Sequence, residues 1–277
     1  MTIKKLAIAT LISASIAAPA FAGDPAYFEE FVNLRMSRDD QGVLLVEMHS
    51  DGGSITFNAK AHTEFVDAFY AIGRDRENSV VILTGVGDWG ASIDPASFGN
   101  IGDPDTWSKV HDEGTQMLEN LANIRVPMIA AVEGKAWIHS EYALLADIIV
   151  AGEGASFNDV PHFAGGLVPG DGIYTTWSYR AGVGRTQEFL YDPQPLAAAT
   201  AQEWGVVSEV VSAGTTVKRA HEIAHAMIEG RPALTLRNTR IHFVQPLKER
   251  IVSEVGYGLA LEGASAGALV KQLSAAN

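Results

Sequence analysis

Cysteine is absent from this 277-residue sequence, and basic residues are much rarer than acidic ones. Without cysteine, disulfide bonds, thiolate metal ligands and thiol nucleophiles are all excluded. Lysine and arginine together number 20 against 33 aspartates and glutamates, which gives a net charge of −13. The basic residues also form no cluster along the chain, so we expect neither a nucleic acid nor an anionic membrane as a partner.

Long apolar runs are confined to the N-terminus of the chain. The basic residues Lys4 and Lys5 precede an apolar stretch over residues 6–18, and Ala20-Phe21-Ala22 has the small-x-small pattern of a cleavage site. We therefore expect residues 1–22 to be a secretory signal peptide, which implies an exported protein, periplasmic or secreted. The apolar stretch is too short to span a bilayer, so no membrane association is expected after cleavage.

The remaining sequence has the composition of an ordinary globular protein, with enough length for one large core. Residues 32–38 and 43–49 alternate apolar and polar side chains around a polar turn, which predicts a β-hairpin. Helical spacing and short apolar runs then alternate: helices are expected at 61–72, 105–124, 140–146, 197–204 and 217–228, and strands at 80–83, 126–132, 148–150 and 206–211. This alternation predicts an α/β fold with mainly parallel strands, comprising a catalytic core over 23–229 and a helical region over 230–277.

Two histidines and an aspartate are the strongest candidates for chemistry. His162 precedes Asp171 by nine residues, Asp171 lies between two glycines, and His139 lies upstream. A carboxylate that orients an imidazole converts water into a nucleophile, so His162 is the candidate base and Asp171 its partner. His139 would donate a hydrogen bond to the oxygen on which charge develops. The alternative is a structural role, since an aspartate between glycines is typical of a turn.

A second pattern, His221-Glu222-Ile223-Ala224-His225, matches the H-E-x-x-H motif of zinc proteases. No third ligand follows at the spacing of the extended motif. The polar face of an amphipathic surface helix accounts for the same residues. We therefore predict no catalytic metal, and we predict no cofactor.

Several motifs occur in an order that resembles the crotonase (enoyl-CoA hydratase/isomerase) superfamily. They are Val80-Val81-Ile82-Leu83-Thr84-Gly85, Ser92-Ile93-Asp94, the stretch 126–134, and Ala146-Asp147-Ile148-Ile149-Val150-Ala151 leading into Ala155-Ser156-Phe157. The resemblance implies a spiral of ββα units with a C-terminal helical region that assembles as a homotrimer or a dimer of trimers. It also implies that an enolate is stabilised by backbone N–H groups near Ile93 and His139.

Departures from the superfamily pattern narrow the resemblance. Trp137-Ile138-His139-Ser140 replaces a glycine-rich stretch, Tyr142 and His162 stand where hydratases carry glutamates, and Asp171 replaces a small residue. Together these changes resemble the 6-oxocamphor hydrolase branch, the β-diketone hydrolases. That branch implies two further site residues, His62 in the first helix and Glu262 near the C-terminus, which could form a secondary pair.

The predicted function is cofactor-independent cleavage of a carbon–carbon bond in a small-molecule β-diketone by a retro-Claisen route. Water attacks one carbonyl, the bond breaks to a carboxylate and an enolate, and the enolate is protonated. The candidate pocket walls are apolar: Phe57, Ile93, Trp137 and Trp177. Two alternatives stay open, an acyl-CoA hydratase or isomerase, which is the commoner activity on this fold, and a non-catalytic exported binding protein.

Overall fold

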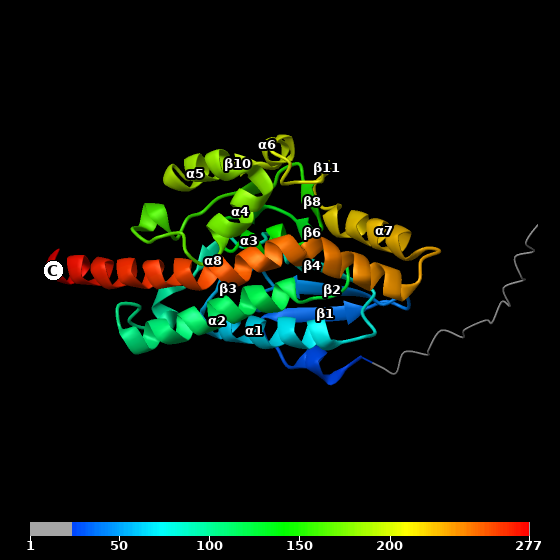
Figure 1. The fold of residues 1–277 in the computed structure, drawn as a ribbon, viewed down its shortest axis with the longest axis horizontal. Helices are drawn as coiled ribbons and strands as arrows, with labels where there is room; N and C mark the ends of the chain where they lie inside the picture. The colour runs from blue at the N-terminus through cyan, green and yellow to red at the C-terminus, as the bar shows by residue number, and fades with distance from the viewer. Residues whose placement is uncertain (1–23, 277) are drawn as a thin grey trace, which may run out of the picture.

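A computed structural model describes residues 24–276, so the expected signal peptide lies outside the described residues. Its centre is a six-stranded sheet in the order β1-β2-β4-β6-β8-β11 (Figure 1). β1 and β2 form the predicted antiparallel hairpin, and all the other neighbours pair in parallel. The strands are β1 Leu34–Arg38, β2 Val43–Met48, β4 Val80–Gly85, β6 Met128–Val132, β8 Ile148–Gly152 and β11 Glu209–Val211. The predicted α/β class is confirmed.

Shorter strands form two small sheets beside the main one. A two-stranded sheet pairs β3 with β5, and a three-stranded sheet has the order β10-β9-β7. These strands are β3 Thr56–Phe57, β5 Ser92–Ile93, β7 Lys135–Ala136, β9 Ser156–Phe157 and β10 Leu196–Ala197. β5 and β7 lie in the segments that leave the carboxyl ends of β4 and β6, and such ends are where parallel sheets commonly bind ligands.

The apolar run of β4 is explained by burial on both faces of the sheet. Val81 and Leu83 belong to the main core, whereas Val80 and Ile82 pack in a second cluster under α7 (Thr216–Ile228). β2 and β4 are in register from Val43↔Val80 to Met48↔Gly85. A strand covered on both faces carries no polar alternation, which is why four consecutive apolar residues predict it.

The remaining helices cover the core and position the site. They are α1 Ala59–Arg74, α2 Pro104–Ala122, α3 Glu141–Leu144, α4 Ile173–Ala181, α5 Val183–Tyr191 and α6 Ala198–Glu203, with short 3-10 turns at Ala26–Glu29, Pro95–Phe98 and Phe163–Gly165. Capping side chains fix two of the starts: Asn58 accepts hydrogen bonds from the first turn of α1, and Asp103 does so for α2. The sequence pattern does not predict the helices α4 and α5.

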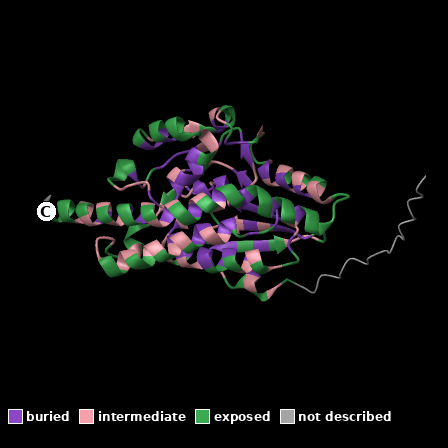
Figure 2. Ribbon diagram, in the orientation of Figure 1, coloured by how far each residue is buried: buried purple, intermediate pink, exposed green. Residues whose placement is uncertain are grey.

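The C-terminal region is one long helix, α8 (Ala233–Ala276), which crosses the molecule and extends beyond the other elements (Figure 1). Its buried side chains recur every four residues, at Leu247, Ile251, Val255 and Leu259, and they form a stripe that faces the core. Figure 2 shows this buried stripe in the middle of α8 and exposure toward its end. Within residues 24–276, no helix combines the length and apolarity needed to cross a membrane.

Candidate active site

Four of the five predicted catalytic residues come together from separate parts of the chain. His139 precedes α3, His162 follows β9, Asp171 precedes α4, and Glu262 lies on α8. Oδ2 of Asp171 lies 3.5 Å from both Nδ1 of His139 and Nε2 of His162. Oε1 of Glu262 lies 3.6 Å from the same Nε2 of His162. The fold therefore places two imidazoles and two carboxyl groups in one buried cluster.

Asp159 orients the ring of His162. Nδ1 of His162 lies 2.5 Å from Oδ1 of Asp159, and both side chains are buried. The sequence interpretation gave this role to Asp171, but Asp171 faces the opposite ring nitrogen at a longer distance. Asp159 lies three residues before His162 in the same loop, so its short spacing was the one available signal. The carboxylate that orients this ring is therefore a residue that the sequence analysis missed.

His139 is held by Glu141 and by two aromatic rings. Its Nδ1 lies 2.6 Å from Oε1 of Glu141, and its ring stacks on Tyr142 with centroids 4.8 Å apart and an interplanar angle of 4°. The ring of Phe57 meets it edge-on at 4.6 Å. His139 also has a φ of +52°, in the left-handed region that is uncommon for residues with a side chain. Phe57 thus supports His139 from the core.

The two imidazoles are held in the charged state by their neighbours. Burial opposes the charge on His162, but the carboxylates of Asp171 and Asp159 outweigh it and raise the pKa of His162 well above its ordinary value. Burial likewise opposes the charge on His139, and Glu141 and Asp171 raise the pKa of His139 to about 10. Burial opposes ionisation of Asp171, yet His162 and His139 hold the pKa of Asp171 well below its ordinary value. At neutral pH this cluster is a buried network of imidazolium and carboxylate ions.

In two other buried carboxyl groups, those of Glu141 and Glu262, the pKa is raised, in contrast to that of Asp171. Burial and repulsion from Asp171 raise the pKa of Glu141 to about 7. Burial also raises the pKa of Glu262, against the opposing effect of the His162 imidazolium. Oε2 of each glutamate is buried without a hydrogen-bond partner among residues 24–276. Carboxylates of raised pKa are better suited than ordinary ones to accept a proton at neutral pH.

His62 lies beside the cluster but does not pair with Glu262. Its Nδ1 lies 2.8 Å from Oε2 of Glu113, whose other oxygen accepts a hydrogen bond from Oγ1 of Thr63 at 2.6 Å. The predicted pair of His62 and Glu262 is therefore wrong, because α1 and α2 pack together and supply a nearer carboxylate. Burial lowers the pKa of His62, so its imidazole is neutral at neutral pH.

A small cavity of about 210 Å³ joins these groups. His62, His139, Glu141, His162, Asp171 and Glu262 supply its polar part. The rest of the wall is mostly apolar and comes from β5 and the segment after it, from α2 and from α8: Ile93, Pro95, Phe98, Ile101, Trp107, Val110, Met117, Leu118 and Leu259. Ile93 lines the cavity as expected. The arrangement suits a small apolar molecule that presents oxygen atoms to one end.

Three of the four predicted pocket residues belong instead to the supporting structure: Phe57, described above, Trp137 and Trp177. Trp177 is fully buried, and its Nε1 donates a hydrogen bond to Oγ of Ser140 at 2.9 Å. Nε1 of Trp137 donates to Oγ of Ser156 at 3.0 Å, and Lys135 lies over its ring. Neither tryptophan lines the small cavity. Their size and apolarity were correctly recognised, but Trp177 lies in the core, and the half-buried Trp137 follows β7 and is held outside the cavity by Ser156 and Lys135.

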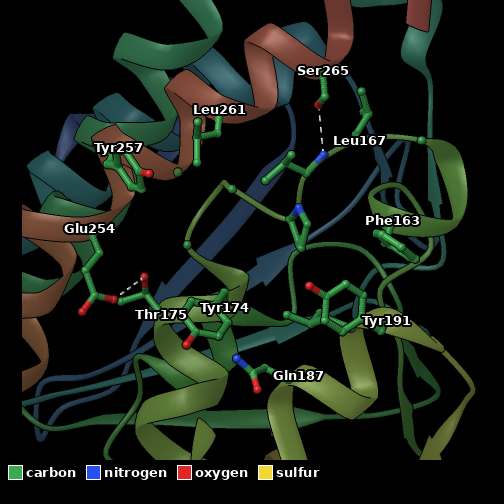
Figure 3. A pocket seen from close by; sticks show the side chains of 17 residues that line it. Phe163, Leu167, Tyr174, Thr175, Gln187, Tyr191, Glu254, Tyr257, Leu261 and Ser265 are labelled. Atoms are coloured by element: carbon green, nitrogen blue, oxygen red, sulfur yellow. Dashed lines mark hydrogen bonds between the residues drawn. The ribbon is translucent and has the colours of Figure 1, made fainter. Parts of the chain in front are cut away.

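A larger hollow of about 660 Å³ adjoins the small cavity and shares Leu167 with it. Figure 3 shows its aromatic rim, with Tyr174 and Tyr191 on one side and Tyr257 of α8 on the other. Oγ1 of Thr175 donates a hydrogen bond to Glu254 in its wall. None of the clustered histidines and acids lines this hollow, so the candidate catalytic groups lie only in the small cavity among the described residues.

One group in the small cavity has ligand atoms close enough for a metal ion. One atom each from His139, Glu141 and Asp171 lies within 4.8 Å of the others. A metal ion at Nδ1 of His139 would have to replace the proton that now joins this nitrogen to Glu141. The network already has its own positive charges, the two imidazolium ions.

The mixed sheet with its long C-terminal helix, and the buried histidines and acids at the carboxyl ends of its strands, define a crotonase-type enzyme. The chain belongs to the enoyl-CoA hydratase/isomerase family, whose sequence model matches residues 38–255. It is similar to the solved structure of a beta-diketone hydrolase from the cyanobacterium Anabaena sp. PCC 7120, bound to (S)-3-oxocyclohexyl acetic acid. That similarity has 46% sequence identity and a TM-score of 0.88, and it covers 90% of this chain and 100% of the other.

Other relatives act, by their names, on coenzyme A thioesters. The probable peroxisomal enoyl-CoA hydratase 1 of Arabidopsis thaliana is 27% identical over 231 residues, which are 83% of each chain. A carnitinyl-CoA dehydratase of Salmonella enteritidis is 31% identical over 180 residues, 63% of this chain and 67% of the relative. An enoyl-CoA hydratase/isomerase structure from Mycobacterium paratuberculosis, at 22% identity and a TM-score of 0.78 with 87% and 98% coverage, shares the fold.

Proposed function

We propose that this enzyme hydrolyses a carbon–carbon bond of a small cyclic β-diketone without a cofactor. The observation that carries the proposal is the polar end of the small cavity, where His139, His162, Asp171 and Glu262 meet in an otherwise apolar space. The similarity to the Anabaena beta-diketone hydrolase supports it at 46% identity. The reaction needs a base for water, a donor for a negatively charged oxygen and an acid for carbon, and this cluster contains all three kinds of group.

Stabilisation of the negatively charged oxygen is assigned to His139. Its Nδ1 is engaged with Glu141 and Asp171, so Nε2–H is the donor that a substrate oxygen in the cavity can meet. When water adds to a carbonyl carbon, the carbonyl oxygen becomes an oxyanion. A positioned donor of this kind stabilises the transition state by about 3 kcal/mol, and the positive charge of the imidazolium adds to the effect.

The base is assigned to Glu262. The sequence interpretation gave this role to His162, but an imidazolium held between Asp159 and Asp171 is a proton donor. Glu262 lies beside it with one buried oxygen that has no partner among the described residues. In the proposed step, Glu262 takes a proton from the attacking water while Nε2–H of His162 holds the carboxylate and the water in place.

Collapse of the tetrahedral adduct completes the reaction. The carbonyl re-forms, the carbon–carbon bond breaks, and its electron pair passes to the second carbonyl as an enolate. Glu262 then returns its proton to the enolate carbon, which restores the starting protonation of the site. The products are a ketone and a carboxylic acid, and the acid loses its proton to solvent. One water molecule is consumed in the balance.

The cavity limits the size of the substrate. Its volume of about 210 Å³ is below the roughly 300–1,000 Å³ of sites for drug-sized ligands. The ligand of the Anabaena enzyme carries a ketone and a carboxylic acid on a six-membered ring. Joining that carboxyl carbon to the ring carbon that is next to the ketone and opposite the side chain, with loss of water, gives bicyclo[2.2.2]octane-2,6-dione. We take this diketone as the first test substrate.

The test uses the purified chain without residues 1–22. Incubation with bicyclo[2.2.2]octane-2,6-dione is expected to give 3-oxocyclohexyl acetic acid. Chiral gas chromatography detects this product and measures its enantiomeric composition. In H₂¹⁸O one label enters the carboxylate, and in D₂O one deuterium enters beside the ketone. No product across a panel of monocyclic and bicyclic diketones would overturn the proposal. Ligand binding without turnover would favour the binding-protein alternative.

Similarity to acyl-CoA enzymes makes an enoyl-CoA hydratase or isomerase the second candidate. Against it stand Tyr142 and His162, which occupy positions where the resemblance places the hydratase glutamates. Tyr142 is buried under the ring of His139 and cannot serve as the missing carboxylate. Hydration of crotonyl-CoA, measured beside the diketone assay, separates the two candidates.

A further inference from the structure

A second group of metal-binding side chains lies away from the cavity and is not used by the proposed reaction. It consists of Asp39, in the turn between β1 and β2, and His221 and His225, on α7. One ligand atom from each of the three residues lies within 4.8 Å of the others. Nε2 of His225 lies 2.7 Å from Oδ2 of Asp39, and the rings of His221 and His225 have centroids 5.9 Å apart.

The geometry of this group is fixed by its surroundings. Oδ1 of Asp39 accepts hydrogen bonds from the backbone N–H groups of Gln41 and Val43, each at 2.9 Å, which leaves Oδ2 directed at His225. His221 and His225 are four residues apart on a regular helix, so both side chains lie on one face of α7. All three side chains are partly buried, and they need little further ordering before a ligand binds.

The glutamate of the H-E-x-x-H pattern is directed elsewhere. Oε2 of Glu222 accepts a hydrogen bond from Arg219 at 3.1 Å, and its other oxygen lies 4.0 Å from Lys218. A zinc protease needs this glutamate beside the metal as a general base. The pattern is therefore not a protease site, but its two histidines still point to the same place and gain a third partner, Asp39, that the sequence spacing did not reveal.

We propose that Asp39, His221 and His225 bind a divalent transition-metal ion, with Zn²⁺ as the reference ion. Two imidazole nitrogens and one carboxylate oxygen suit zinc and its neighbours, whereas magnesium and calcium prefer oxygen ligands throughout. Ligands of tetrahedral zinc stand about 3.3 Å apart, given metal–ligand distances near 2.0–2.1 Å. Nε2 of His225 and Oδ2 of Asp39 are 2.7 Å apart, and the three ligand atoms lie within 4.8 Å of one another, so rotations of these partly buried side chains can bring them to this spacing. The ion would replace the proton between His225 and Asp39. A water molecule would complete the four ligands.

The ion would connect parts of the chain that are distant in sequence. Asp39 and His225 are separated by 186 residues, and they join the hairpin turn to α7. Asp39 precedes β2, so the group lies at the amino-terminal edge of the parallel strands, whereas His139 follows β6 and β7 at the carboxyl edge. A ligand that binds only the folded chain stabilises it. We therefore expect the bound ion to stabilise the folded chain and to leave the small cavity unchanged.

Calorimetric titration with ZnCl₂ tests the proposal on the tag-free chain without residues 1–22, after treatment with a chelator. We expect one Zn²⁺ per chain, a higher melting temperature with zinc, and Co²⁺ absorption bands typical of tetrahedral coordination. His221→Ala and His225→Ala should each weaken binding at least tenfold. The matched control, Glu222→Gln, changes the neighbouring residue of the same helix and should bind zinc as the wild type does.

A further variant distinguishes zinc binding at this group from zinc binding at the second candidate group, His139, Glu141 and Asp171 in the small cavity. Asp171→Asn removes a ligand from the His139 group and should leave zinc binding intact. Loss of binding in Asp171→Asn together with retention in His221→Ala would overturn the proposal, as would the absence of any binding. Circular dichroism of each metal-free variant shows whether it is folded. If a histidine variant does not fold, Asp39→Asn is used instead, because its amide oxygen can still accept the turn hydrogen bonds.

Discussion

Nδ1 of His162 lies 2.5 Å from Oδ1 of Asp159, with both side chains buried. This contact leaves Nε2 as the nitrogen that faces Asp171 and Glu262. A single imidazole is therefore surrounded by three carboxyl groups, and its charge depends on all of them. The pair also explains why Asp171 is available to serve both histidines at equal distances.

Replacement of Asp159 by asparagine tests this relationship. Removing its charge should lower the pKa of His162, because Asp159 is one of the three carboxyl groups that raise it, with Asp171 and Glu262. The ring also loses its charged partner, and we expect kcat to fall by about 10- to 100-fold, in the range of lost second-sphere partners. NMR titration of the His162 ring measures the pKa. The exposed Asp51→Asn is the control, and an unchanged His162 pKa in Asp159→Asn would contradict the assignment.

Glu262→Gln tests the proposed base. Glutamine keeps the size of the side chain but cannot accept the proton of water, so kcat for the diketone should fall by about 10²- to 10⁴-fold. KM should change little, because the cavity walls are retained. Steady-state kinetics provide the measurement, and Glu249→Gln, an exposed change on the same helix, is the control. Activity within tenfold of the wild type would remove Glu262 from the mechanism.

Stability should fall at high pH because of His139. The pKa of this residue in the folded chain is raised to about 10, above its ordinary value of 6.5. A raised histidine pKa means that the folded state binds the proton more tightly, so this contribution is fully present below 6.5 and is lost as pH rises through about 10. The difference in melting temperature between wild type and His139→Gln should therefore shrink between pH 7 and pH 10.5. The exposed His242→Gln should show no such trend.

The sequence predicts those features that depend on local pattern. The hairpin and the run Val80–Leu83 were identified because alternation and two-sided burial each leave a periodic trace. Glu262 was found through the family resemblance, since its nearness to His162 depends on how α8 crosses the core. From the sequence, neither Asp159 nor Glu141 is assigned a role, because their short spacing from His162 and His139 does not by itself show that the backbone turns each carboxylate toward its histidine. The same limit applies to Trp177, whose apolar surface fits a pocket and a core equally well.

Trp177→Phe should affect stability and leave kinetics unchanged. The indole is fully buried and its Nε1 donates to Ser140, so the change removes a buried hydrogen bond and some packing. We expect the free energy of unfolding to fall by about 1–3 kcal/mol, with kcat/KM within threefold of the wild type. Urea denaturation and steady-state assays measure the two effects. Trp107→Phe, at a tryptophan that lines the cavity, should instead raise KM.

The exposed apolar side chains of α8 bear on the assembly expected from the crotonase resemblance. Tyr257 is 71% exposed and Phe243 64% exposed, and Tyr257 lines the larger hollow opposite Tyr191, itself 68% exposed. Exposed large apolar side chains spread along one helix are typical of surfaces that a second copy covers. Light scattering after size exclusion should give three or six times the mass of one chain. Tyr257→Glu should shift the mass toward one chain, whereas Gln272→Glu, also exposed on α8, should not. A wild-type chain that remains single at high micromolar concentration would contradict the expectation, and the apolar surface of α8 would then need another occupant.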